Sequence, residues 1–165
     1  MNKKVLMGLV LLTLVGSSMV FAQVPTLDKL QFSNLESGAK KQVRAVNTSI
    51  SGEVVIPATW EGAPVVGVGS PYFRNCTAIT SVVIPASFNN ILATAFEGCT
   101  SLTSVTFLGT TSITNSNSFP GDLRAKYLAA NGGPGTYTRQ RGSDTWTKQA
   151  GRTICPHCNG TGFLD

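Results

Sequence analysis

The sequence predicts a β-rich α/β solenoid, a stack of short repeated units between an N-terminal and a C-terminal cap. The first observation is a period: Phe73 and Phe96 lie 23 residues apart, and several positions after them repeat at the same spacing. The second is that each unit alternates apolar and hydroxyl residues, which is typical of a strand with one buried face. The third is composition, since only 13% of the residues are charged. A fixed period of this length indicates stacked repeats.

Equivalent positions of successive units should form columns of side chains inside the stack, because one unit cannot bury its own apolar face. The spacing of three residues between the first two columns indicates a single helical or 3₁₀ turn before each strand. We expect a column of rings, a column of thiols and a column of aliphatic side chains: Phe73, Phe96 and Phe119; Cys76 and Cys99; Ile79 and Leu102.

Residues 95–107 read Ala-Phe-Glu-Gly-Cys-Thr-Ser-Leu-Thr-Ser-Val-Thr-Phe, a pattern that closely resembles the BspA-like leucine-rich repeat. Residues 52–66 resemble the opening repeat of such arrays, and residues 123–148 resemble the segment that often closes them. The resemblance implies a short leucine-rich-repeat stack. It also implies a non-enzymatic protein that mediates adhesion or protein–protein contact at a cell surface.

The sequence departs from the family pattern at three places. Leu92 and Ala93 stand where a Gly-Asp turn is usual, which leaves the bend there unassigned. Tyr72 replaces the small residue that normally precedes the phenylalanine. Asp122 replaces the cysteine of a third unit, so the repeats should end there.

Residues 1–22 have the three parts of an export signal peptide. Lys3 and Lys4 give a positive start, an apolar run follows, and small residues precede a cleavage point after Ala22. The apolar run is too short to cross a membrane, and no transmembrane span is expected after cleavage. We therefore expect the protein to be secreted, periplasmic or at the cell surface.

The rest of the chain divides around the repeats. Leu123, Tyr127 and Leu128 form the apolar stripe of a short helix, and two extended pieces after it predict a hairpin. The expected segments are 1–22, signal peptide; 23–49, N-terminal cap; 50–119, leucine-rich repeats; 120–153, C-terminal cap of helix plus hairpin; and 154–165, a CxxCxGxG tail.

The candidate binding residues lie on the polar face of the stack. Thr80, Thr103 and Ser104 should present hydroxyl groups to a partner. Trp60 is the best exposed aromatic candidate because it lies in an excursion that lengthens the first unit by five residues beyond the period, although a position at the edge of the core fits equally well. The expected partners are extracellular or envelope proteins; a structural envelope component without a discrete ligand is an alternative.

Basic residues gather near the C-terminus. The formal net charge is +5, or +3 without Lys3 and Lys4, and residues 120–153 hold most of the remaining positive charge. Such a segment can bind nucleic acid, anionic glycans or membranes. Because these bases are scattered and no aromatic stacking motif accompanies them, we interpret the segment as a solvated cap and expect no nucleic acid partner.

The four cysteines fall into two classes. Cys76 and Cys99 occupy one repeat position, where neighbouring strands about 4.8 Å apart permit a disulfide, although buried free thiols are favoured. Cys155 and Cys158 have the spacing of a zinc-binding pair, and residues 155–162 resemble half of the CxxCxGxG element of DnaJ-type chaperones. A tetrahedral zinc site needs four ligands. With His157 at most a third ligand, zinc binding here would need a second chain.

Two other interpretations of Cys155 and Cys158 stay open. One is a thiol-redox pair, which needs a thioredoxin-type context that this chain does not show. The other is an inert tail, which requires no particular structural context. A periplasmic zinc-binding or thiol-redox protein is therefore the alternative function. No catalytic residues are predicted, since the single histidine lies in this tail and the carboxylates form no glycosidase pair.

Overall fold

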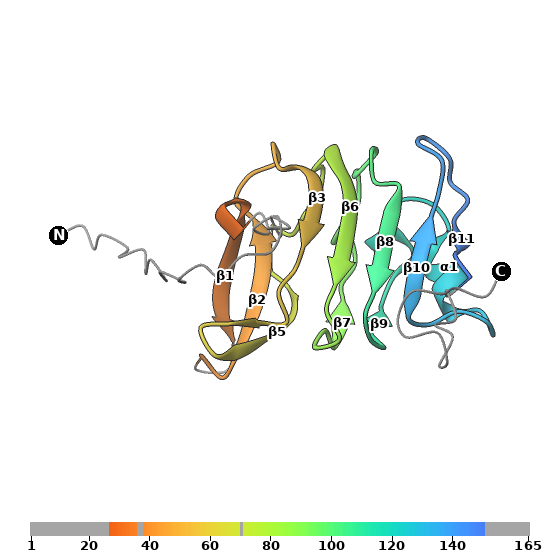
Figure 1. The fold of residues 1–165 in the computed structure, drawn as a ribbon. Coiled ribbons are helices and arrows are strands. Elements are labelled where there is room, and N and C mark those ends of the chain that lie inside the picture. Colours follow the sequence, from red (N-terminus) through yellow and green to blue (C-terminus); the bar gives the residue numbers. More distant parts are fainter. Residues whose placement is uncertain (1–26, 36–37, 70, 151–165) are drawn as a thin grey trace, which may run out of the picture.

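Strands dominate the computed structural model, and the central ones lie side by side (Figure 1). The structure describes residues 27–35, 38–69 and 71–150. Within these residues the only α-helix, α1, has six residues. The elements are η1 Leu27–Lys29, β1 Leu30–Leu35, β2 Lys40–Ala45, β3 Ser51–Val55, β4 Thr59–Trp60, β5 Ala63–Val68, β6 Ala78–Ile84, β7 Asn90–Ile91, β8 Ser104–Phe107, β9 Ser112–Ile113, η3 Ser116–Ser118, α1 Leu123–Leu128, β10 Gly135–Thr138 and β11 Thr147–Lys148.

The strands form three sheets, with orders β1-β2-β5-β4, β11-β10-β8-β6-β3 and β7-β9. Strands β3, β6 and β8 are parallel, and Val82 pairs with Val105 one period later. Strands β7 and β9 pair in parallel in the same way, with Ile91 opposite Ile113. Parallel pairing at equivalent positions is what a repeated unit produces when it stacks on itself.

Three phenylalanine rings pack face to face through the repeats. The centroids of Phe73 and Phe96 are 5.1 Å apart and those of Phe96 and Phe119 are 4.8 Å apart, with interplanar angles of 9° and 8°. All three side chains are buried. Such pairs contribute roughly 0.5–1.5 kcal/mol beyond the burial of their area. The column joins three successive units although the third has lost most of its other repeat residues.

The segment before each repeat strand is a hydrogen-bonded turn. The Cys76 N–H donates to the Phe73 carbonyl at 3.2 Å, and the Cys99 N–H donates to the Phe96 carbonyl at 3.2 Å. These i→i+3 bonds bear out the expected single turn, but no helix forms in either turn. The helical content is therefore lower than the predicted α/β class implies, and the strand-rich part of that prediction is confirmed.

Asn75 and Gly98 occupy the same place in their turns, just before the cysteines. Both are in the left-handed region, with φ of 60° and 75°. Glycine adopts this conformation without a steric penalty, and asparagine tolerates it better than most residues. The turns also bond to one another, because the Asn75 N–H donates to the Glu97 carbonyl at 2.7 Å.

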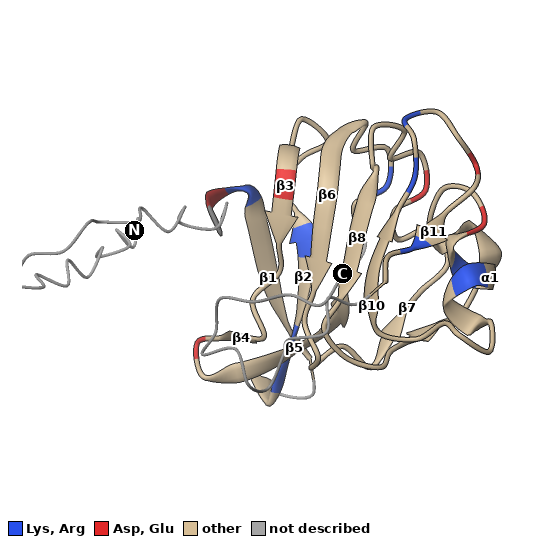
Figure 2. Ribbon diagram, turned by 45° about the vertical axis from the view of Figure 1, so that its right-hand side comes forward, with Lys and Arg blue, Asp and Glu red and all other residues tan. Residues whose placement is uncertain are grey.

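Charge is nearly absent from the middle of the molecule. Between residues 62 and 121 the only charged side chains are Arg74 and Glu97, which pair at 2.8 Å. Figure 2 shows β6, β8 and β10 without any Lys, Arg, Asp or Glu, whereas both ends of the described chain carry several. The repeats are thus a neutral scaffold between charged ends.

Candidate functional site

A shallow groove of about 510 Å³ lies over the turns and strand starts of two neighbouring units. We call it the polar groove. Its lining carries hydroxyl groups and one cation, with no aromatic ring and no carboxylate. The lining residues are Thr77, Ala78, Thr80, Ser101, Thr103 and Arg141.

The floor of the polar groove comes from equivalent positions of two units. Thr80 and Thr103 are 23 residues apart, and the Thr103 N–H donates to the Thr80 carbonyl at 2.9 Å. The Thr103 hydroxyl donates to the same carbonyl at 3.2 Å. Ala78 and Ser101 are a second matched pair. The period therefore sets the spacing between hydroxyl groups along the floor.

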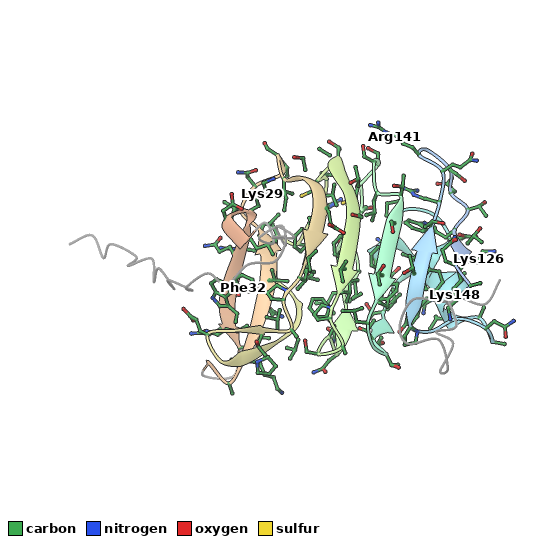
Figure 3. The ribbon with its side chains drawn as sticks, in the orientation of Figure 1. Lys29, Phe32, Lys126, Arg141 and Lys148 are labelled. Atoms are coloured by element: carbon green, nitrogen blue, oxygen red, sulfur yellow. The ribbon has the colours of Figure 1, made fainter. Side chains whose placement is uncertain are left out.

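Arg141 closes one side of the polar groove from outside the repeats. It lies on the loop between β10 and β11, at the upper end of the molecule in Figure 3. Its Nη2 donates to the hydroxyl of Ser101 at 2.9 Å. Ser101 is buried, whereas Arg141 is exposed. The guanidinium thus makes one bond, and its other N–H groups have no hydrogen-bond partner within the described residues.

Arg139 fixes the loop that carries Arg141. Its side chain is 9% exposed, its Nε donates to the Leu102 carbonyl at 2.7 Å, and its Nη1 donates to the Ser143 carbonyl at 2.8 Å. The guanidinium also lies over the ring of Trp146, 5.1 Å from its centroid. Burial lowers the pKa of Arg139 below its usual value, but arginine stays charged at any physiological pH. The loop is therefore bonded to the second repeat unit.

Other bases of the C-terminal segment also bind backbone carbonyls. Arg124 donates to the Ile113 carbonyl at 2.8 Å, and Lys148 donates to the Gly132 carbonyl at 2.8 Å. The interpretation of this segment as a solvated basic cap is wrong for these residues and for Arg139. Their charged groups bind carbonyl groups of the protein's own backbone.

The predicted binding residues lie in three places. Thr80 and Thr103 line the polar groove, while Ser104 lies on β8 opposite Ser81 and does not. Trp60 is half-buried and stacks on Phe32, with ring centroids 4.3 Å apart. Trp60 therefore packs at the edge of the core and does not line the polar groove.

The sequence did not identify Ser101 and Arg141. Ser101 belongs to a repeated unit, and its repeat equivalent Ala78 carries no hydroxyl that would have marked the position. Arg141 lies in the expected turn of the C-terminal hairpin, but the packing of that hairpin against the repeats has no local signal. Only the pairing of β10 with β8 places Arg141 beside Ser101.

Cys76 and Cys99 are free and buried, as favoured from the sequence. Burial raises the pKa of Cys76 to about 11 and that of Cys99 to about 12, so both thiols are neutral at physiological pH. The Cys99 thiol donates to the Phe73 carbonyl at 3.1 Å. Both cysteines therefore act as small, buried side chains of the core.

The predicted zinc or redox pair, Cys155 and Cys158, lies outside the described residues. Among the residues that are described, no group of three or more His, Cys, Asp or Glu side chains could hold a metal ion. None of the helices in this part of the chain has the length and apolar character that a membrane crossing requires. Zinc at Cys155 and Cys158 stays a prediction, which the metal content of the purified protein with and without Cys158→Ser would test.

Comparison with known protein families supports the repeat assignment. Residues 65–129 match the family described as BspA type leucine rich repeat region (6 copies), which confirms the resemblance inferred from the sequence. No curated protein matches the chain. Among solved structures, the crystal structure of a leucine-rich repeat protein of T. pallidum is 24% identical, with a TM-score of 0.42. The match covers 57% of this chain and 40% of that chain.

Proposed function

We propose that this chain, which carries a BspA-type leucine-rich repeat region at residues 65–129, is an exported, non-enzymatic protein that binds another protein at a cell surface. Repeat regions of this family suggest protein binding or adhesion, and the signal-like residues 1–22 support export. We assign the binding to the polar groove. Thr80 and Thr103 keep their predicted part in it, and Ser101 and Arg141 join them.

The observation that carries the proposal is a polar and open surface on a neutral scaffold. The Thr103 hydroxyl donates to the Thr80 carbonyl, and Arg141 donates to the hydroxyl of the buried Ser101. Groups that are already ordered lose little conformational entropy when a ligand binds. The groove therefore offers preorganised hydrogen-bond donors and acceptors, which suit recognition.

The small size of the groove sets the expected strength of binding. A stable interface between two proteins buries roughly 800 Å² on each partner, which is more than a groove built from two repeat units supplies. We expect one copy to bind weakly. Several copies on a cell surface or in an oligomer would bind the same partner much more tightly through avidity.

The test uses the purified full chain displayed at high density on beads, with a panel of extracellular matrix and envelope proteins as probes. Ala78 is exposed in the groove, and Ala78→Trp fills the groove without changing the charge. Ala130→Trp is the matched control, because Ala130 is exposed and does not line the groove. We expect A78W to lose capture of the partner and A130W to keep it. Equal capture by A78W would reject the groove as the site.

Export needs a separate measurement. Cells that express the full chain would be treated with a protease that does not enter them, and the chain would be followed by immunoblotting. We expect digestion on intact cells. Protection until the cells are lysed would contradict a role at the surface.

A further inference from the structure

We propose that the polar groove recognises the carboxylate of an acidic peptide segment of the partner protein, with Arg141 as the carboxylate receptor. This inference rests on the proposed function and names the chemistry of the partner. It follows from the charges around the groove, from the geometry of the guanidinium and from the neutral groups that flank it.

Arg141 differs from the other bases in the described part of the C-terminal segment. Lys126 pairs with Asp122 at 3.7 Å, and Arg124 and Lys148 donate to backbone carbonyls. Arg141 has one bond, to a neutral hydroxyl, and no ion pair within the described residues. A guanidinium has five N–H donors in a fixed fork. Arg141 is therefore the base of this segment that lines the polar groove and still has donors for a ligand.

The guanidinium of Arg141 is oriented before any ligand arrives. Its Nη2 bond to Ser101 attaches it to a buried side chain of the second repeat unit. The carbonyl bonds of Arg139, two residues earlier, fix the start of the same loop. Arginine forks bind carboxylates through two parallel hydrogen bonds, and a fixed fork loses little entropy in doing so.

The hydroxyl groups suit the peptide that would carry this carboxylate. The Thr103 hydroxyl donates to the Thr80 carbonyl, which leaves its lone pairs free to accept from a peptide N–H. Thr77 and Thr80 are exposed and can donate to peptide carbonyls. No carboxylate lines the groove, so nothing there repels an acidic side chain.

The lining also favours a peptide over a nucleic acid. Single-stranded nucleic acids bind by stacking their bases on aromatic side chains, in addition to charge contacts. Thr, Ser, Ala and Arg line the polar groove, and none of them offers an aromatic platform.

The experiment follows the Nε–Hε signals of the arginines by NMR in the full chain. The probe is the peptide acetyl-Gly-Ser-Glu-Ser-Gly-amide, and its matched control has Gln in place of Glu. We expect the Arg141 signal to shift and saturate with the Glu peptide. The Gln peptide should bind about tenfold more weakly, because a charge-assisted bond is lost.

Two variants test whether the effect belongs to Arg141 or to net charge. Arg141→Gln removes the receptor, and Lys126→Gln makes the same charge change on α1, away from Arg141 in Figure 3. We expect R141Q to lose saturable binding and K126Q to keep it. Equal affinity for both peptides, or equal loss in both variants, would overturn the proposal.

A third arm separates the inference from the function on which it rests. Oligogalacturonate presents carboxylates on sugars, and binding of it through Arg141 without binding of the Glu peptide would overturn the acidic-peptide assignment. If A78W loses the protein partner while R141Q keeps it, the groove function stands and the carboxylate proposal fails. If wild-type beads capture nothing while the Glu peptide still saturates Arg141, the surface function fails and the carboxylate site stands.

Discussion

The repeats at residues 73–107 and the C-terminal segment at residues 122–150 are built on different principles. The repeats are neutral and periodic, and the backbone N–H and C=O groups of each unit form hydrogen bonds with the neighbouring unit. The C-terminal segment has no period, and several of its cations bind the backbone. The Ile91 carbonyl accepts from the Thr114 N–H, whereas its equivalent in the next unit, Ile113, accepts from the Arg124 side chain.

This difference shows how the array ends. A buried carbonyl needs a hydrogen-bond partner, and the last unit has no further unit to provide one. Arg124 and Arg139 supply donors at the positions where the next strand or turn would have been. The segment that ends the array also carries Arg141, so the charge of the polar groove comes from the aperiodic region while its floor comes from the repeats.

The largest expected loss in the free energy of unfolding comes from a substitution in the repeats. Phe96 is fully buried and lies between two other rings, and Phe96→Ala removes both stacked contacts and leaves a cavity. We expect the free energy of unfolding in urea to fall by about 3–5 kcal/mol. Leu108→Ala, at a side chain that is 60% exposed, is the control and should change it by less than about 0.5 kcal/mol. A similar loss in both variants would contradict a core centred on the rings.

Removal of the buried arginine should have the next largest effect, in the C-terminal segment. Arg139→Ala leaves the Leu102 and Ser143 carbonyls without their donor, and we expect a loss of about 2–4 kcal/mol. Hydrogen exchange should rise in β10 and β11 before it rises in β6. Uniform exchange across all strands would show that the segment and the repeats unfold as one unit.

The same contrast explains what the sequence could predict. The period of 23 placed Phe73, Phe96 and Phe119 in register, because identical spacing forces identical surroundings in a stack. Arg139 and Arg141 are two residues apart, one buried and one exposed, and nothing local distinguishes them. Their difference arises from the pairing of β10 with β8, a contact between segments distant in the chain. Thr80 and Thr103 of the groove floor were therefore predictable, whereas Ser101 and Arg141 were not.

The pH dependence of stability should come in part from the thiols of the repeats. Burial raises the pKa of Cys76 to about 11 from an ordinary value of 9.0, and that of Cys99 to about 12. Above pH 9 the unfolded chain loses these protons while the folded chain keeps them, so the free energy of unfolding falls as pH rises toward 11.

The double variant Cys76→Ala and Cys99→Ala tests this dependence. Unfolding in urea at several pH values between 9 and 11 should show a shallower decline than in the wild-type chain. Burial also raises the pKa of Tyr137, so a residual decline is expected in the variant. Identical slopes would show that the thiols contribute nothing to it.

The smallest expected change in the free energy of unfolding comes from a substitution at Arg141. Arg141 is exposed and donates one side-chain bond within the described chain, so Arg141→Gln should change the free energy of unfolding by less than about 0.5 kcal/mol. Arg139→Gln, the same substitution two residues earlier, should cost several times more, because it removes bonds to buried carbonyls. Thermal and urea unfolding of both variants beside the wild type measure the difference. An equal loss in the two would mean that Arg141 serves the fold as Arg139 does, and that its free N–H groups are not held ready for a ligand.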